Sequence, residues 1–349
     1  MNEPIGFAIV GTGAIADVHA GAILGNADAR LVAAYSRGAA ACADFAKRHG
    51  CRAAASLEEI IRDPSVRAVC ITTPSGAHAE AAVPLLEAGK AVLCEKPLEI
   101  TLDAVDRMLA AAERGGGMLA GVFQMRLGRG AGTLKRAIEI GRFGQLTLCS
   151  AYVKWWRTQA YYSGSPWKGT WRLDGGGALM NQGIHAVDLL QWLAGMPEEV
   201  SAFSATLAHP GIEAEDTIVA SLRFANGTLG SIEAATAAYP GSDLRIEIIG
   251  ERGTAILVND RIVRWEFAEP LPEDAAVLAD DAPPIKSSFA DPMSLTHEGH
   301  RRLVNDLVDA VREGRPPMIP GIEARNAVAL VLAIYEAARS GARTGVGWL

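Results

Sequence analysis

The 349-residue sequence predicts an α/β protein of two domains, a doubly wound parallel sheet and then an α+β domain with a large open, mostly antiparallel sheet. Three observations lead to this prediction. At about 150 residues per domain, the length fits two domains. Apolar segments alternate with helix-like segments over residues 1–123, whereas strand-like segments follow one another from about residue 145. We therefore expect a first domain over 1–123 and a second over 124–349.

Five strands and four helices are expected in the first domain. The strands are apolar almost throughout, which indicates a parallel sheet covered on both faces. Thr101 precedes the last helix as a plausible N-cap, and glycines follow that helix. The strands are expected at 5–10, 30–36, 67–73, 90–95 and 118–123, and the helices near 15–24, 38–49, 77–88 and 101–114.

The second domain is expected to be mostly antiparallel. Its Asn226-Gly227 pair is typical of a tight hairpin. The acidic, proline-containing segment 269–288 indicates a surface loop. Strands are expected at 145–156, 199–207, 216–224, 227–236, 244–250 and 253–258, and helices at 183–195, 297–313 and 322–340.

Charge and composition exclude several classes of partner. The chain has 33 Lys+Arg and 40 Asp+Glu, a net charge of −7, whereas nucleic-acid binding requires a basic surface. An acidic chain is also not attracted to an anionic membrane. We see neither a secretory signal nor an apolar run of about 20 residues, and the five cysteines form no CxxC pair. We therefore expect a cytoplasmic protein with reduced thiols, no membrane contact and no nucleic-acid partner.

The segment GTGAIA (11–16) follows the first strand and opens the first helix, as a dinucleotide-binding fingerprint does. Gly11 would allow the tight turn, and Gly13 would let the backbone approach a pyrophosphate. The free N–H groups of Ala14 and Ile15, at the start of the helix, would bind the phosphates. The alternative is an ordinary strand-to-helix turn.

The end of the second strand bears on the choice between NAD and NADP. NAD sites have an acidic residue about 20 residues after the fingerprint, but this chain has Ser36 and Arg37 there. Both side chains suit a ribose-linked phosphate, which favours NADP. NAD stays open, because Arg37 also fits an exposed surface position.

Two further loops follow strands of the first domain, at the edge where open α/β sheets bind ligands. In TTPSGAH (72–78), we expect Thr73, Pro74 and His78 to flank the cofactor, although His78 also fits an ordinary first helical turn. In CEKP (94–97), Lys96 is expected to hold a substrate hydroxyl or carbonyl. The alternative is that Glu95 and Lys96 are surface charges.

The segment GGGALMNQGIHAVD (175–188) combines glycines with polar side chains. The glycines would let the backbone approach a flat ligand, and Asn181 and His185 would share one face of a helix. The pKa of histidine suits proton exchange near neutral pH, but a half-buried histidine at a helix start is the alternative. Asp188 would orient His185 or pair inside the helix layer. HEGH (297–300) lacks HExxH spacing, so no metal is expected.

Together, GTGAIA, TTPSGAH, CEKP and GGGALMNQGIHAVD resemble the Gfo/Idh/MocA oxidoreductase family, in matching order along essentially the whole chain. The family joins an N-terminal Rossmann domain to a C-terminal domain with an open sheet that often makes oligomer contacts. Its members oxidise or reduce sugars, polyols and sugar derivatives with NAD(P), usually without a metal. The resemblance implies such an enzyme, assembled as a dimer or tetramer through its C-terminal sheet.

The resemblance also implies roles for individual residues. Lys96 would hold and polarise the reacting oxygen, with a cis bond to Pro97, and His185 would be the general acid/base. Asn181 stands where many members have aspartate, so it would position substrate without exchanging a proton. Contacts with the cofactor are implied for Glu95, Lys96, Gln124, Trp171 and Arg172, of which Gln124 would also serve the substrate.

Residues 154–177 and the MNQGIH segment are similar to dehydrogenases of UDP-linked sugar acids. Their aromatic side chains suit sugar C–H surfaces, and their arginines suit carboxylates. A structural aromatic cluster, or a free sugar acid or polyol as substrate, stays open. The expected substrate-binding residues are Gln124, Arg157, Tyr161, Trp167, Arg172 and Asn181. A coupled oxidoreductase with tightly bound cofactor and a non-catalytic cofactor sensor are the alternative functions.

Overall fold

The computed structural model describes residues 3–279 and 297–347, apart from the side chain of His297. It contains two compact units, 1–124 with 297–325, and 125–296 with 326–349. The first boundary lies one residue after the expected one. Residues 297–325, which the sequence analysis placed in the second domain, belong to the first unit in the structure.

The first unit is built on a six-stranded parallel sheet with strand order β3-β2-β1-β4-β5-β6. This order confirms the doubly wound fold and makes the boundary between β1 and β4 its switch point. The strands are β1 (Ile5–Val10), β2 (Ala29–Tyr35), β3 (Arg52–Ala53), β4 (Ala68–Ile71), β5 (Ala91–Cys94) and β6 (Met118–Gly121). Of these strands, the short β3 was not predicted, and neither was the helix at Leu57–Arg62 that follows it.

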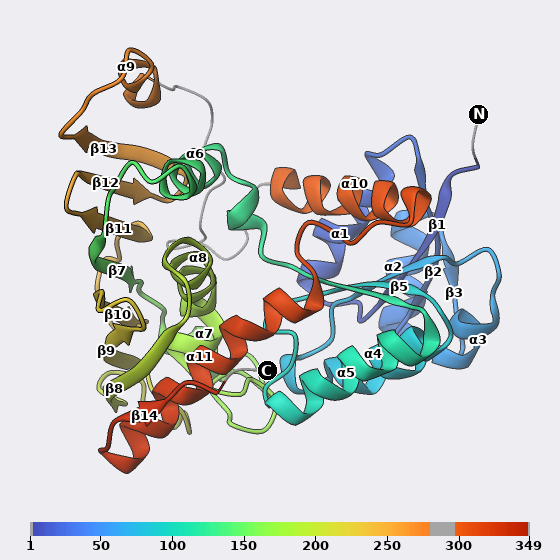
Figure 1. The fold of residues 1–349 in the computed structure, drawn as a ribbon. Helices are drawn as coiled ribbons and strands as arrows, with labels where there is room; N and C mark the ends of the chain where they lie inside the picture. The colour runs from blue at the N-terminus through green and yellow to red at the C-terminus, as the bar shows by residue number, and fades with distance from the viewer. Residues whose placement is uncertain (1–2, 280–296, 348–349) are drawn as a thin grey trace. The chain divides into compact units, whose positions relative to one another are not determined.

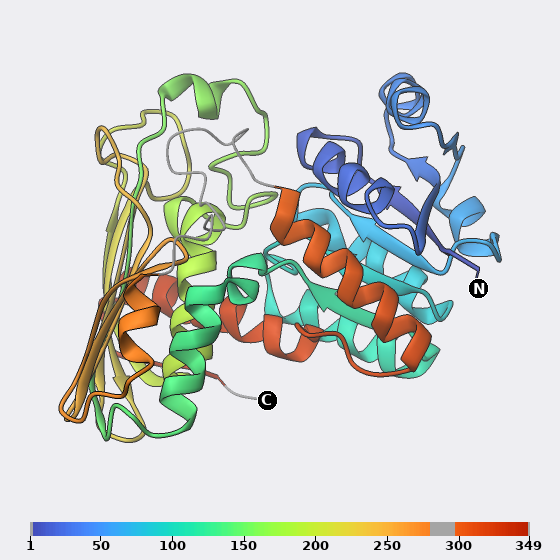
Figure 2. The same ribbon diagram turned by 90° about the horizontal axis from the view of Figure 1, so that it is seen from above.

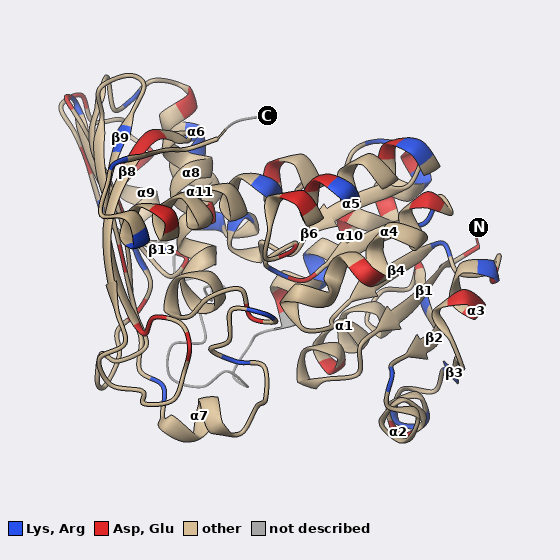
Figure 3. Cartoon of the chain, turned by 90° about the horizontal axis from the view of Figure 1, so that it is seen from below, with Lys and Arg blue, Asp and Glu red and all other residues tan. Residues whose placement is uncertain are grey.

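Helices flank this sheet, and their caps follow from the sequence. Thr101 accepts a hydrogen bond from the Ala104 N–H (3.3 Å), and Gly116 ends the same helix at φ 67°. The helices are α1 (Ala14–Leu24), α2 (Ala39–His49), α3 (Leu57–Arg62), the 3₁₀ turn η1 (Ser75–Ala77), α4 (His78–Glu87) and α5 (Leu102–Gly115). Helix α5 carries both acidic and basic residues (Figure 3).

The returning segment completes the first unit with α10 (His297–Glu313). Helix α10 lies beside α1 and reaches β5 (Figure 1). The backbone of β6 pairs with the segment after α10, where Gly121 N–H donates to Ile319 O (3.0 Å). Arg312 also pairs with Asp28 (2.8 Å). These contacts explain why α10 belongs to the first unit, although its His300 is 205 positions after Glu95 in the sequence.

The second unit is built on an eight-stranded sheet with strand order β13-β12-β11-β7-β10-β9-β8-β14. Its pairs are antiparallel except β7–β10, so the expected mostly antiparallel sheet is confirmed. The Asn226-Gly227 hairpin joins β9 to β10, with Gly227 at φ 85°. The strands are β7 (Leu146–Lys154), β8 (Pro197–Ala205), β9 (Thr217–Phe224), β10 (Leu229–Ala235), β11 (Arg245–Gly250), β12 (Gly253–Val258), β13 (Arg261–Phe267) and β14 (Thr344–Gly345).

Helices of this unit cover one face of the sheet (Figure 2). The other face, as far as the chain is described, carries no helix. The helices are α6 (Arg129–Glu139), α7 (Gln159–Ser163), α8 (Ile184–Ala194), α9 (Asp274–Leu278) and α11 (Gly321–Ser340), which begins in the first unit, with the short η2 (Gln124–Leu127) and η3 (Ala178–Gly183). The expected loop at 269–288 contains α9, and its part from 280 onward lies outside the described residues. Within the described ranges, no helix is long and apolar enough to cross a membrane.

Candidate active site

The fingerprint loop follows β1 and has the geometry that a pyrophosphate requires. Gly11 has φ +98°, and a Cβ there would lie 2.6 Å from the carbonyl carbon of Thr72. Gly13 is the N-cap of α1, and beyond its own stretch of chain no atom of the described residues lies within 4 Å of the position a Cβ would take. Gly13 and Ala14 are exposed and Ile15 is half-buried. The open N-terminus of α1 is therefore accessible to phosphates.

Backbone and hydroxyl contacts bring the second strand and the loop after β4 to this fingerprint. Thr72 Oγ1 donates to Gly11 O (2.8 Å), and Thr12 Oγ1 donates to Ser36 Oγ (3.0 Å). Arg37 is exposed, and Thr73 and Pro74 are half-buried. The expected cofactor residues at 11–15, 36–37 and 73–74 therefore lie along one edge of the parallel sheet.

His78 begins α4, in the first helical turn that the sequence analysis considered for it, and its side chain is buried. Its ring is 1% exposed, with Nδ1 2.8 Å from Pro97 O and Nε2 2.9 Å from Thr73 O. Both ring nitrogens thus face backbone carbonyls of the two ligand-side loops. The structure makes His78 a buried connection between those loops, and a direct contact with cofactor stays a prediction.

The CEKP segment ends β5, two strands from β1 in the sheet. Lys96 is half-buried, and its bond to Pro97 is cis, which confirms the expected geometry. The carboxylate of Glu95 is directed into the unit, where it lies 2.9 Å from His19 Nε2 and 3.2 Å from His300 Nε2. The structure places Glu95 in a buried hydrogen-bonded cluster, and its contact with the cofactor stays a prediction.

Burial alone raises the pKa of Glu95, but the hydrogen bonds from His19 and His300 hold that pKa well below its usual value. Burial lowers the pKa of His19, against the opposing effect of Glu95. Neither histidine was predicted from the sequence to belong to this group. The HEGH segment (297–300) was the available signal, but it was weighed only against a metal site.

Gln124 is the last residue of the first unit and follows β6. Its side chain is buried (8% exposed), yet its Oε1 has no hydrogen-bond partner among the described residues. A buried acceptor without a donor costs free energy. Gln124 therefore fits the expected polar contact with cofactor or substrate.

In the second unit, the glycines of 175–177 pack against the chain itself. A Cβ at Gly176 would lie 2.2 Å from Tyr335 Oη, and one at Gly177 would lie 1.7 Å from Glu215 O. Glycine is needed at both positions for these internal contacts. The expectation that these two glycines admit a flat ligand is thus replaced by an internal packing role.

Glu215 and Tyr335, both missed in the sequence, support this glycine loop. Glu215 accepts hydrogen bonds from the N–H groups of Gly177 (3.0 Å) and Leu179 (2.8 Å) and from Tyr335 Oη (2.9 Å). Burial raises the pKa of Glu215 to about 7, although these donors lower it. The carboxyl thereby anchors the segment that leads to His185.

The helix that carries His185 starts earlier than expected. Residues 178–183 form a π-helical turn, η3, which continues directly into α8. Asn181, in η3, donates from Nδ2 to Asp174 Oδ1 (2.6 Å). His185 lies half-buried in the first turn of α8. Asp188 forms a buried ion pair with Arg126 (2.7 Å). This is the pairing inside the helix layer that was considered for it.

Several expected substrate residues form an aromatic and basic cluster in the second unit. Lys168 Nζ lies 3.7 Å from the Tyr161 ring centroid, and the Arg157 guanidinium carbon lies 5.4 Å from the same centroid. Tyr161 Oη accepts a hydrogen bond from Gln182 Nε2 (3.0 Å), the neighbour of Asn181. Burial raises the pKa of Tyr161 to about 12. The cluster thus presents cations and hydrogen-bonding groups around one aromatic ring.

The same segment of the chain carries three further residues that were predicted to contact substrate or cofactor, Trp167, Trp171 and Arg172. Trp167 is half-buried, and Arg172 is exposed. Trp171 is 46% exposed; its Nε1–H donates to Glu213 O (3.0 Å), and its ring meets Tyr335 edge-on at 5.2 Å. The contacts of Trp171 and Arg172 with cofactor stay predictions.

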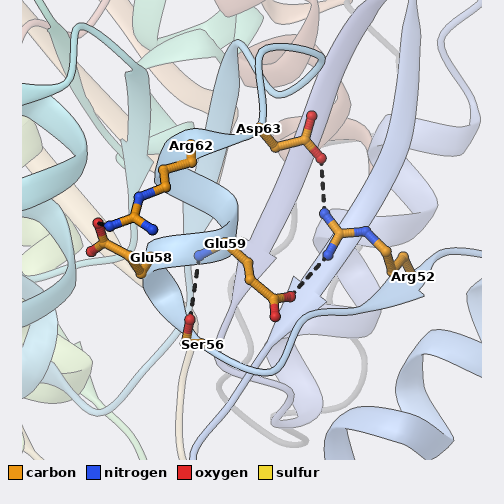
Figure 4. A pocket seen from close by; sticks show the side chains of 6 residues that line it. All are labelled: Arg52, Ser56, Glu58, Glu59, Arg62 and Asp63. Carbon is orange, nitrogen blue, oxygen red and sulfur yellow. Dashed lines mark hydrogen bonds and ion pairs between the residues drawn. The ribbon is translucent and has the colours of Figure 1, made fainter.

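A surface hollow of about 350 Å³ lies beside α3 in the first unit (Figure 4). Arg52 pairs there with Glu59 (3.1 Å) and Asp63 (2.8 Å). Arg62 pairs with Glu58 (2.9 Å). These charges bind one another, so the hollow is not part of the candidate site.

The parallel sheet, the open fingerprint loop and Lys96 at the end of β5 define a dinucleotide-binding oxidoreductase. Residues 5–122 match the model of an oxidoreductase family with NAD-binding Rossmann fold, and residues 132–256 match the GFO/IDH/MocA C-terminal domain. The chain belongs to the Gfo/Idh/MocA family, as the sequence motifs indicated. It is an enzyme of the oxidoreductase class, which disfavours the non-catalytic sensor.

Two curated relatives and one solved structure illustrate the similarity. Inositol 2-dehydrogenase of Rhizobium meliloti is 31% identical over 75% of this chain and 78% of its own length. The NADP-linked scyllo-inositol 2-dehydrogenase IolU of Bacillus subtilis is 30% identical over 76% of this chain and 79% of its own. The crystal structure of the WlbA dehydrogenase from Bordetella pertussis, in complex with NADH and UDP-GlcNAcA, is 35% identical, covers 100% and 99% of the two chains and has a TM-score of 0.90.

Proposed function

We propose that the chain is an NAD(P)-dependent dehydrogenase that moves a hydride between a nicotinamide and a carbinol carbon of a sugar-like substrate. The observation that carries the proposal is Lys96 at the carboxyl end of β5, in the same parallel sheet as the open fingerprint loop after β1. In open α/β sheets, ligands bind at this edge.

Each residue of the site has a distinct task in this reaction. The bound nicotinamide supplies C4 as hydride acceptor or donor. The Lys96 ammonium holds the reacting hydroxyl oxygen, and His185 removes its proton as the carbon gives up hydride and becomes a carbonyl. An amide cannot exchange the proton, so Asn181 positions the substrate through its own bond to Asp174.

We propose a nucleotide-linked sugar acid as the substrate. The full-length similarity to the WlbA dehydrogenase bound to UDP-GlcNAcA supports this class. The cations Arg157 and Lys168 beside Tyr161 suit a carboxylate on a pyranose ring. The alternative is an uncharged polyol, which the similarity to inositol 2-dehydrogenase favours.

Turnover of UDP-GlcNAcA tests this function. We expect NAD(P)H formation, seen as absorbance near 340 nm, with UDP-GlcNAcA and much less with free glucuronic acid or myo-inositol. Absorbance there in purified protein before cofactor is added would favour the coupled oxidoreductase. A protein that binds no nicotinamide cofactor would contradict the whole proposal.

The same assay decides cofactor preference, for which we propose NADP. Ser36 and Arg37 follow β2, where NAD-dependent sites have a carboxylate. A guanidinium at this position attracts the additional phosphate of NADP. We expect kcat/KM to be higher with NADP; a preference for NAD of more than about tenfold, or 1.4 kcal/mol, would reverse the assignment.

The chain is further expected to form homo-oligomers through the uncovered sheet face. Leu148 (43% exposed) pairs with Leu229 (55%), and Phe203 (84%) pairs with Val219 (47%) on neighbouring strands. Exposed apolar side chains on neighbouring strands are a candidate surface for association.

Leu229→Asp should therefore shift the mass measured by light scattering toward the monomer. Ile140→Asp serves as the control, because Ile140 is similarly exposed (58%) but lies at the end of α6, away from that face. A wild-type monomer, or equal effects of both changes, would disprove the interface.

A further inference from the structure

The cluster of His19, Glu95 and His300 joins three separate parts of the first unit. His19 belongs to α1, Glu95 follows β5, and His300 belongs to α10 (Figure 1). The side chains are almost fully buried, at 0%, 7% and 2% exposure respectively. A charged carboxylate is retained at such a position only with strong compensation.

The hydrogen-bond geometry fixes the roles of the two rings. Both Nε2 atoms face the same oxygen, Glu95 Oε1, at 2.9 Å from His19 and 3.2 Å from His300. A carboxylate oxygen accepts, so both Nε2 atoms carry a proton. Each Nδ1 is buried and has no hydrogen-bond partner among the described residues. In the described part of the chain, no second hydrogen bond at Nδ1 therefore competes with the bond that each ring donates to Glu95.

The other carboxylate oxygen faces the residue assigned to substrate. Glu95 Oε2 accepts a hydrogen bond from the backbone N–H of Lys96 (3.2 Å). The two histidines therefore fix one end of the carboxylate while its other end holds the Lys96 backbone. The edge-on contact of the two rings, with centroids 4.9 Å apart, limits rotation of the group further.

We propose that His19 and His300 are positioning residues that orient Lys96 through the Glu95 carboxylate. The role of Lys96 in this inference rests on the proposed function. Helix α10, supplied by the returning chain, thereby contributes to the site without contacting substrate. Divalent metal binding is the competing use of these groups, because their potential ligand atoms all lie within 4.8 Å of one another.

Two variants of His300 separate positioning from packing. His300→Leu removes the Nε2–H donor and keeps an apolar side chain, whereas His300→Gln supplies an amide N–H in its place. Hydrogen exchange of the Lys96 amide, followed by NMR in the full-length protein, reports the Glu95 contact directly. We expect about tenfold faster exchange in His300→Leu and recovery in His300→Gln.

Activity gives the second readout. Because small misplacement of a catalytic group is costly, kcat should fall about ten- to a hundredfold in His300→Leu with little change in cofactor KM. The glutamine variant should recover most of that kcat. Asn305→Ala is the matched control: it removes a different hydrogen bond of α10, the one that Asn26 Nδ2 donates from the loop after α1 (2.7 Å), and should leave Lys96 exchange and kcat unchanged.

Equal exchange and equal kcat in the leucine and glutamine variants would overturn the proposal. So would one equivalent of a transition metal in purified wild type that is lost in His300→Leu. If wild type turns over no substrate, the proposed function fails, yet the exchange measurement still decides whether the cluster holds the Lys96 backbone.

Discussion

Replacing His185 by alanine is expected to lower kcat by two to four orders of magnitude, the usual contribution of a general acid/base. The residue lies half-buried in the first turn of α8, directly after the π-helical turn that carries Asn181. Residue 181 is an asparagine, and its amide cannot exchange a proton. It therefore cannot take over proton transfer when the imidazole of His185 is removed. In the alanine variant, the proton of the substrate hydroxyl would have to pass to water.

Steady-state kinetics and cofactor titration together check this expectation. The dissociation constant for NAD(P)H should change little, because the fingerprint loop belongs to the first unit. Added imidazole should restore part of the activity of the alanine variant. Asn181→Ala is the companion variant, and it should raise substrate KM more than it lowers kcat. Retention of more than about a tenth of wild-type kcat in His185→Ala would rule out the proposed role.

Lys96→Met is expected to reduce kcat by about two to three orders of magnitude, the range seen when one donor to a developing oxyanion is lost. Methionine preserves most of the side-chain volume but removes the charge and the donors. The backbone bond from Lys96 N–H to Glu95 does not depend on the side chain, so the loop should keep its conformation.

Thermal unfolding provides the necessary control for Lys96→Met. A ligand that binds the native state raises its melting temperature, so NAD(P)H should protect this variant nearly as well as wild type. Lys96→Arg retains the charge with different geometry and should recover only part of the activity. Full activity in Lys96→Met would contradict the assignment, whereas lost protection would show that Lys96 mainly binds cofactor.

The sequence was sufficient for most of the fold because the relevant signals are local. Continuous apolar strands such as Ile5–Val10, entirely buried in the structure, separate the parallel sheet from alternating strands such as Thr217–Phe224. The fingerprint likewise depends only on neighbouring residues, since Gly11 needs its positive φ and Gly13 marks the start of α1.

The incorrect parts of the prediction depend on distant contacts. The apolar face of α10 shows that the helix packs, but it does not show against which sheet. The glycines at 176 and 177 are explained by Tyr335 and by the backbone of Glu215, far along the chain. Likewise, a buried carboxylate such as Glu95 cannot be distinguished in sequence from a surface charge until its partners are known.

The discontinuous first unit has a consequence for biosynthesis. Domains usually fold as units while the chain emerges from the ribosome, the N-terminal one first. Here β1 to β6 are synthesised early, but the helix that covers α1 follows only at residues 297–313. Helix α1 of the first unit therefore stays without its α10 neighbour until residues 297–313 have been synthesised. Nascent chains stalled before residue 297 would be expected to depend on chaperones for solubility.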